Sequence, residues 1–232
     1  MLRDLKIIYQ LSKDHIDIYA TFIADLPSLL FVLVNKNFLN LSANFYSLFS
    51  LFLGLLASFF VIFENIKIAI LFFYFSLIFD FVDGKVARLQ KTSSIQGKRI
   101  DIMVDRTIFV FLSFSYLYYL FNNKYSSLIF FLFLGAIFLF LLHDTLNQLN
   151  LLVNSTKQNN SKVNAPIIIK TLSVKISSAK SWIPRNISIF ILLFMVLPYF
   201  NFNLNILLLL LFIIFGHFLK DFFRTFFNKK TL

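Results

Sequence analysis

Long apolar runs separated by short polar segments are the dominant pattern of this chain. Six of them have about the 20 residues that cross the hydrocarbon core of a bilayer. They cover residues 44–63, 66–87, 102–121, 127–147, 186–202 and 203–219. Backbone groups in lipid must be hydrogen-bonded within the protein, and these continuous runs lack the alternation of membrane barrel strands. We therefore expect an all-α integral membrane protein with six transmembrane helices.

The first 43 residues differ from these runs because acidic residues interrupt them, which does not fit a cleavable signal. Apolar positions at helical spacing between Leu5 and Phe22 predict an N-terminal amphipathic helix on the membrane surface. A loosely ordered cytoplasmic tail is the alternative. We expect a cytoplasmic or interfacial segment over 1–43, a six-helix membrane domain over 44–226 and a cytoplasmic tail over 227–232.

Composition and charge agree with a membrane protein. The chain is 59% hydrophobic, contains 34 Phe and has a net charge of +11. With the N-terminus inside, only Lys67 and Lys124 of its basic residues lie near the outer face, so the positive-inside rule makes both termini cytoplasmic. The charge therefore reflects topology and not nucleic-acid binding. We expect a protein of the bacterial cytoplasmic (inner) membrane, in which the polar loop 148–185 faces the cytoplasm.

Four aspartates stand out because they lie inside apolar helices, where an ionisable side chain costs about 2.5–3.5 kcal/mol. Asp80 and Asp83 lie on one predicted helix, and Asp101 and Asp105 on the next. Spacings of three and four residues place each pair on one helical stripe, and the short basic connection makes the helices antiparallel neighbours. At 1.5 Å per residue, all four lie about 6–12 Å below the cytoplasmic surface. We expect their carboxylates to converge.

Converging carboxylates repel one another unless cations neutralise them. A ligand set of oxygens alone favours Mg²⁺, Mn²⁺ or Ca²⁺ over zinc, and two such ions on a pyrophosphate support in-line displacement at phosphorus. Gly84 and Gly97 leave room for a ligand on the same stripes, and Arg88 is suited to a phosphate. In the alternative, the acids are buried partners of nearby Lys and Arg. That alternative explains neither the glycines nor the matched stripes.

The block from Asp80 to Asp105 fills the pattern D-x2-D-G-x2-A-R-x8-G-x3-D-x3-D without a gap. It resembles the signature of the CDP-alcohol phosphotransferase (CDP-alcohol phosphatidyltransferase) family of six-helix membrane enzymes. A second motif of that family, Pro-Asn-x-x-Thr, is matched in part by Ala43-Asn44-Phe45-Tyr46-Ser47. The resemblance implies transfer of a phosphoalcohol group, such as the phosphatidyl group of CDP-diacylglycerol, to an acceptor alcohol with release of CMP. It also implies two Mg²⁺ or Mn²⁺ ions and a homodimer.

The resemblance further implies a role for each matched residue. Asp105 would be the catalytic base that takes the proton of the acceptor alcohol. The metal ligands would be Asp80, Asp83, Asp101 and Asp105. The CDP-binding residues would be Gly84, Ala87, Arg88 and Gly97, with Asn44 as a further candidate.

The acceptor alcohol is left open by the signature, since glycerol 3-phosphate, serine, inositol and its phosphate all remain possible. His143 and Asp144, near the end of the fourth span, are candidate acceptor ligands, and so is Arg185 at the end of the polar loop. The alternatives are a polar helix end for the first two and a topology-setting charge for Arg185.

Two other functions compete with the transferase. A membrane prenyltransferase also uses aspartates and Mg²⁺ on a diphosphate, but it needs two separated acidic motifs, whereas these acids form one block. A cation transporter needs polar residues through several helices, and the outer halves of these spans are almost purely apolar.

Overall fold

The computed structural model describes residues 21–160, 189 and 191–227, and every regular element among them is helical. The first elements form one N-terminal helical segment, made of η1 (Thr21–Asp25), α3 (Leu26–Val34) and η2 (Asn35–Leu39). The elements that follow are α4 (Ala43–Ile62), α5 (Ile66–Leu89), α6 (Ile95–Asn122), α7 (Ser127–Asn160), η3 (Leu192–Val196), α10 (Leu197–Tyr199) and α11 (Leu204–Phe227). The expected all-α class is confirmed for this part of the chain.

The helices begin close to the predicted apolar spans, but several extend beyond them. α6 starts at Ile95, well before 102, because Ser94 caps it and its Oγ accepts a hydrogen bond of 3.0 Å from the Gly97 N–H. The predicted cytoplasmic connection 88–101 therefore shrinks to 90–94. α7 likewise continues to Asn160, so helix occupies the start of the predicted polar loop. A helix does not have to end where the apolar run ends.

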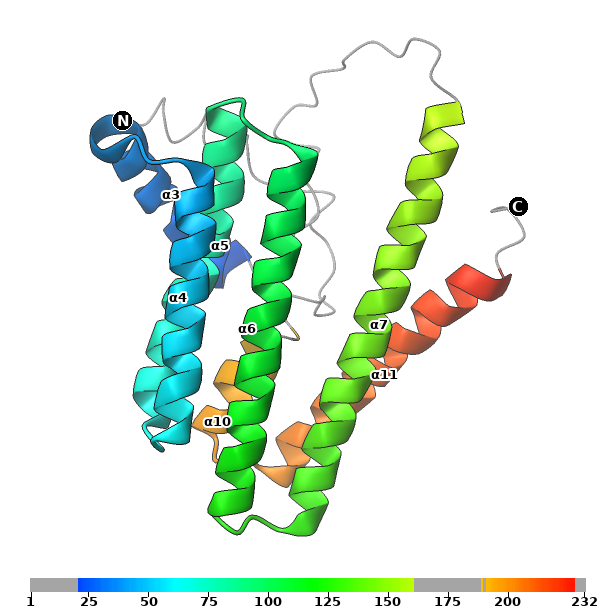
Figure 1. The fold of residues 1–232 in the computed structure, drawn as a ribbon. Coiled ribbons are helices and arrows are strands. Elements are labelled where there is room, and N and C mark those ends of the chain that lie inside the picture. Colours follow the sequence, from blue (N-terminus) through cyan, green and yellow to red (C-terminus); the bar gives the residue numbers. More distant parts are fainter. Residues whose placement is uncertain (1–20, 161–188, 190, 228–232) are drawn as a thin grey trace.

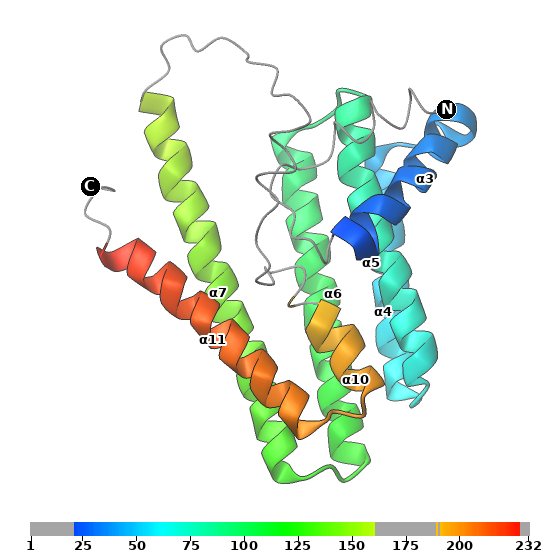
Figure 2. The same cartoon turned by 180° about the vertical axis from the view of Figure 1, so that it is seen from behind.

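Helices α4, α5 and α6 lie side by side, while α7 and α11 form a separate pair that crosses obliquely (Figures 1 and 2). The short elements η3 and α10 lie near one end of α6. The main core contains many aromatic side chains, and Tyr116 lies in it fully buried, donating a hydrogen bond of 3.0 Å to the carbonyl oxygen of Phe194. A second cluster joins the N-terminal helical segment to α5.

Close packing fixes the three central helices against one another. A Cβ added to Gly54 on α4 would lie 2.6 Å from Cγ1 of Ile108 on α6, so only glycine permits this approach. Between α4 and α5, the hydroxyl of Ser50 donates to the carbonyl oxygen of Ser76 and that of Ser76 donates to Ser50, each over 2.9 Å. These bonds satisfy hydroxyls that are buried among apolar side chains.

The turn between α4 and α5 is tied to the far end of α6. Glu64 occupies the left-handed region, with φ at 64°, and its Oε1 accepts hydrogen bonds from the side-chain amides of Asn122 and Asn123 at 3.5 and 3.2 Å. Helices α4, α5 and α6 together are called the trio below. Glu64, Asn122 and Asn123 lie at the end of this trio that is opposite the aspartate block. The three helices are therefore joined at this end as well as along their lengths.

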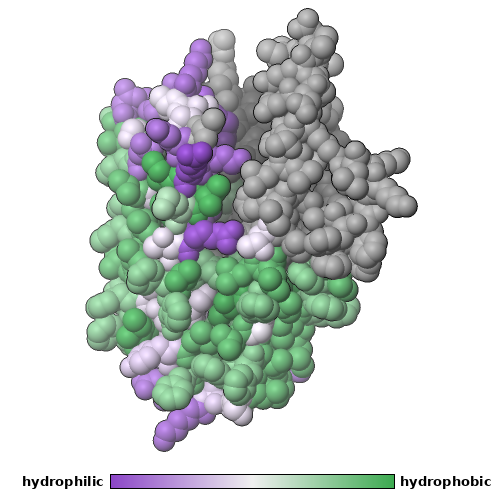
Figure 3. Space-filling model, turned by 45° about the vertical axis from the view of Figure 1, so that its right-hand side comes forward, coloured by the Kyte–Doolittle hydropathy of each residue, from purple (hydrophilic) through white to green (hydrophobic). Residues whose placement is uncertain are grey.

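On the face shown in Figure 3, apolar side chains cover much of the described surface, and hydrophilic residues gather mainly toward its two ends. By length and apolarity, the described segments Phe22–Leu39 and Ala43–Ile62 are sufficient to cross a membrane, and Ser127–Leu142 and Leu204–Leu219 are shorter apolar helices. The count of six transmembrane helices stays a prediction. Most of the predicted amphipathic surface helix falls on residues 1–20, outside the described residues.

The N-terminal helical segment returns to the end of α5. The side chain of Asn35 makes two hydrogen bonds with the main chain of Leu41. Its amide group donates to the Leu41 carbonyl over 3.2 Å, and its Oδ1 accepts from the Leu41 N–H over 2.7 Å. The same carbonyl accepts a hydrogen bond of 3.0 Å from the side chain of Gln90, the residue after α5. The junction between the segment and α4 is thereby fixed beside the last turn of α5.

Candidate active site and metal centre

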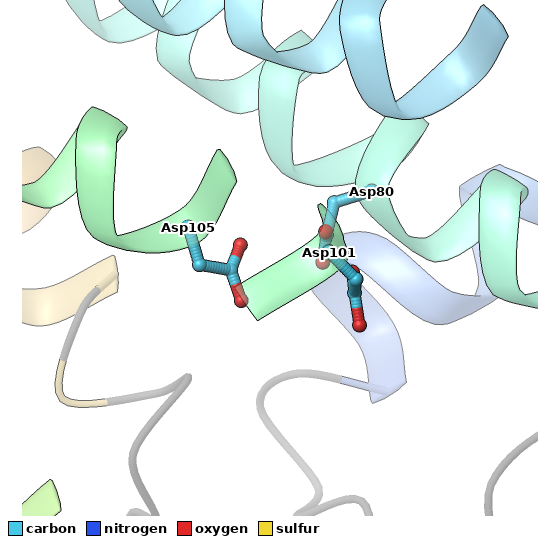
Figure 4. Close-up of side chains that lie close together, drawn as sticks. All are labelled: Asp80, Asp101 and Asp105. Atoms are coloured by element: carbon cyan, nitrogen blue, oxygen red, sulfur yellow. The ribbon is translucent and has the colours of Figure 1, made fainter. Parts of the chain in front are cut away.

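Three carboxylates from two helices face one another near one end of the trio. Asp80 comes from α5, and Asp101 and Asp105 come from α6 (Figure 4). One carboxylate oxygen from each lies within 4.8 Å of the others. Asp80 and Asp101 are half-buried and Asp105 is exposed. Oxygens at this separation are suited to binding a divalent cation, whose charge would offset their mutual repulsion.

The fourth aspartate of the block faces a different helix. Asp83 is 6% exposed, and its Oδ2 accepts a hydrogen bond of 2.5 Å from the hydroxyl of Ser47 on α4. The structure therefore brings three of the four predicted carboxylates into one cluster, with Asp83 beside it on α5. Because Asp80 and Asp83 are three residues apart, they lie near each other on the helix but point to different neighbours.

Gly84 and Arg88 lie one turn apart on α5. A Cβ added to Gly84 would lie 3.4 Å from Nη1 of Arg88, so the guanidinium folds back along the helix over the glycine. Asp83 and Asp101 attract it electrostatically, and so does Asp25 of the N-terminal helical segment. Arg88, the residue predicted to bind a phosphate, therefore lies close to the acids. Their charge attracts its guanidinium, and Gly84 has no side chain that would displace it.

The remaining predicted CDP ligands lie around this end of the trio. Ala87 is half-buried on α5, and Gly97 is half-buried in the first turn of α6, where its N–H binds Ser94. Asn44 is exposed in the first turn of α4, one turn before Ser47. The roles of Ala87, Gly97 and Asn44 in binding a nucleotide stay predictions.

The predicted acceptor ligands are described less fully. His143 and Asp144 lie in α7, but their side chains are outside the described part of the structure. Arg185 lies outside the described residues altogether.

Sequence reasoning missed two buried contacts of this site. Ser47 enters the sequence pattern only as the last residue of a partly matched motif, yet it binds Asp83. Asp25 is one of the acids that interrupt the first 43 residues, yet it is buried and pairs with Lys85, which lies inside the aspartate block. The available signal was an acid within the apolar run from Phe22 to Leu39, because such an acid needs a partner.

Comparison with known proteins assigns the chain to a family. The model of the CDP-alcohol phosphatidyltransferase family matches residues 40–218, which include the whole aspartate block. No curated protein and no solved structure shows significant similarity to the chain. The family match removes the grounds for the prenyltransferase and transporter alternatives. This chain therefore belongs to the CDP-alcohol phosphatidyltransferase family, a family of metal-dependent integral membrane enzymes that transfer a phosphoalcohol group from a CDP-alcohol with release of CMP.

Proposed function

We propose that this enzyme transfers the phosphatidyl group of CDP-diacylglycerol to a small acceptor alcohol during phospholipid biosynthesis. The observation that carries this proposal is the cluster of Asp80, Asp101 and Asp105, whose carboxylate oxygens lie within 4.8 Å of one another in the family's signature block. Its position at one end of helices with largely apolar surfaces suits a donor that is anchored in the bilayer.

The carboxylates fit the divalent cations on which the family depends. Asp80, Asp101 and Asp105 supply only oxygen ligands, which Mg²⁺ and Mn²⁺ prefer. Asp83 would join them, with Ser47 holding its Oδ2. We propose that these four aspartates bind two ions. When bound, the ions would supply positive charge that stabilises the diphosphate as negative charge shifts toward the leaving CMP.

We propose Asp105 as the catalytic base. It is the most exposed of the three clustered acids, so an acceptor entering from solvent can reach it. Its carboxylate would take the proton of the acceptor hydroxyl, and the alkoxide oxygen would attack the β-phosphorus of the donor. A new oxygen–phosphorus bond forms, the bond from that phosphorus to CMP breaks, and CMP leaves with the electron pair.

The donor's nucleotide would bind along α5 and the start of α6. Arg88 is held beside Gly84, where its guanidinium could bind a phosphate oxygen bidentately. Ala87, Gly97 and Asn44 would complete the CDP site. For the acceptor we propose His143, Asp144 and Arg185, on the basis of their cytoplasmic position in the predicted topology.

We further propose six membrane crossings, with both termini and the site on the cytoplasmic side of a bacterial inner membrane. Although Phe22–Leu39 has the length of a span, its two ends are held near the same end of α5. Asp25 pairs with Lys85, and Leu41 binds Gln90. Lys85 in α5 and Gln90 just after it are only about 7.5 Å apart along the helix axis, whereas the helix from Asp25 to Leu39 is about 21 Å long. An oblique position at the interface fits this better than a crossing.

The decisive experiment measures CMP release by the purified full-length protein. CDP-diacylglycerol is offered with a panel of glycerol 3-phosphate, serine, inositol and inositol phosphate, with and without Mg²⁺ or Mn²⁺. We expect one acceptor to give metal-dependent CMP release. Water-soluble CDP-alcohols serve as alternative donors in matched reactions, and cross-linking in native membranes tests the homodimer that the family resemblance implies. Activity with a soluble CDP-alcohol and none with CDP-diacylglycerol would overturn the phosphatidyl assignment.

A further inference from the structure

Helix α5 has two opposite faces with different neighbours. One face carries Asp80 and Gly84 toward the acid cluster. On the other face, Ile78, Val82 and Val86 are buried in an apolar cluster with α3 residues Leu29, Val32 and Leu33. At about 100° per residue, Lys85 belongs to this second face, although it lies within the signature block. The helix that carries the proposed metal ligands is thus also the helix on which the N-terminal segment packs.

Lys85 is buried on that face and its charge is matched. Its side chain is 1% exposed, and its ammonium group donates to the carboxylate of Asp25. It also lies 2.5 Å from the Ser28 hydroxyl and 3.3 Å from the Asp25 main-chain carbonyl, so three acceptors match its three protons. The Ser28 hydroxyl in turn donates to that same carbonyl over 2.7 Å. Asp25 and Ser28 are 2% and 0% exposed.

The position of this ion pair relates it to the site. Lys85 follows Asp83 and Gly84 directly and comes one turn before Arg88. Asp25 pairs with Lys85 and also attracts Arg88, so the N-terminal segment contributes to the electrostatics of the active-site helix. Removing a single member of a buried pair leaves an uncompensated charge, whereas removing both members together is far less harmful. The pair therefore fixes how α5 is rotated and seated against α3.

We propose that Asp25 is a positioning residue for the metal centre, which acts through Lys85 by holding α5 so that Asp80 faces α6 and Asp83 faces α4. This inference rests on the proposed function, because it assigns the N-terminal segment a part in the same site. Asp25 touches neither substrate nor metal. The segment is thus a component of the active-site framework, in addition to the interfacial position proposed for it.

The test measures Mn²⁺ affinity of the full-length protein by electron paramagnetic resonance, without any substrate. We expect Asp25→Asn to weaken Mn²⁺ binding by about tenfold or more, in the range seen when groups that orient metal ligands are removed. The double variant Asp25→Asn with Lys85→Met should bind Mn²⁺ more tightly than Asp25→Asn alone, because no buried charge is left unpaired. Hydrogen exchange over residues 21–39 should rise in the single variant and fall again in the double variant.

Two further variants keep the test decisive. Glu64→Gln is the matched control, because it removes one carboxylate at the opposite end of the trio, and it should bind Mn²⁺ as the wild type does. If Asp25→Asn does not fold, Lys85→Arg takes its place, since it keeps the charge but cannot repeat the three contacts of an ammonium group. We expect Lys85→Arg to weaken Mn²⁺ binding while the protein stays folded.

The outcomes separate this inference from the proposed function. A wild-type protein that binds no Mn²⁺ would defeat the metal site and the inference together, and a wild type that binds Mn²⁺ without releasing CMP would defeat only the proposed function. Wild-type Mn²⁺ affinity in folded Asp25→Asn or Lys85→Arg would overturn the positioning role. Additive losses from Asp25→Asn and Lys85→Met, in place of mutual rescue, would overturn it as well.

Discussion

Ser47 on α4 donates a hydrogen bond of 2.5 Å to Oδ2 of Asp83 on α5, and both side chains are buried. A hydrogen bond to a charged acceptor is stronger than one between neutral groups, and here it sets the direction of a carboxylate next to the acid cluster. The partial upstream motif thus has a structural meaning, because its last position carries a hydroxyl that orients an acid of the signature block.

Replacing Ser47 tests this orientation. We expect Ser47→Ala to fold and to lower Mn²⁺-dependent CMP release or Mn²⁺ affinity by about tenfold, because Asp83 loses its hydrogen-bond donor. Ser47→Thr retains the hydroxyl and should stay near wild type. Activity and metal titrations on the three proteins are compared directly, and equal behaviour of the Ala and Thr variants would argue against the role.

Asp105→Asn removes the proposed base without changing the shape of the side chain. The variant should fold normally and lose at least about a hundredfold in CMP release, since general base catalysis contributes about 10²–10⁴ in rate. Circular dichroism and thermal unfolding verify the fold, and the assay uses saturating Mn²⁺ so that weaker ion binding does not dominate. Normal turnover in a folded Asp105→Asn protein would remove this assignment.

Chelation tests the metal centre as a whole. Treatment with EDTA should abolish CMP release, and excess Mn²⁺ should restore it. Because an ion that binds only the folded state stabilises it, Mn²⁺ should also raise the unfolding temperature of the wild type. Asp101→Asn provides the control, since it should show a smaller shift. Turnover that persists at full rate in EDTA would count against the divalent ions.

Gly54 and Gly135 form a matched pair for testing helix packing. Gly54→Ala places a methyl group 2.6 Å from Ile108, so we expect a loss of about 1–3 kcal/mol in stability from overpacking. Gly135→Ala has nothing within 4 Å of the added group and should unfold at or above the wild-type temperature. Shortening the neighbour, with Ile108→Val in the Gly54→Ala background, should recover part of the loss. Equal unfolding temperatures for the two alanine variants would contradict this close approach.

Much of the framework was predictable from hydrophobic pattern and helical period. The apolar runs located α4 and α5 closely, and the spacing of the acids placed Asp80, Asp101 and Asp105 on facing stripes. These features are local, because they depend on residues within a few turns of one another. The family signature lies in the same stretch, so sequence alone also identified the chemistry.

What sequence could not provide was the neighbour that covers each face of a helix. Helical periodicity places Asp83 on the same stripe as Asp80. It does not predict that Asp83 faces α4 and binds Ser47 there. It gave Lys85 no partner, because Asp25 is 60 residues away and no repeating pattern connects the two. Helix ends were also difficult to predict. α6 begins at a cap formed by Ser94, within a polar segment whose composition is typical of a loop.

The contact between Glu64 and the two asparagines at the end of α6 has a consequence for how substrates enter. The α4–α5 turn is joined to α6 there, and α4 is joined to α5 again near the acids through Ser47 and Asp83. Spreading these three helices to admit a bulky donor would break these contacts. We therefore expect any helix movement that admits a bulky donor to involve the other pair, α7 and α11.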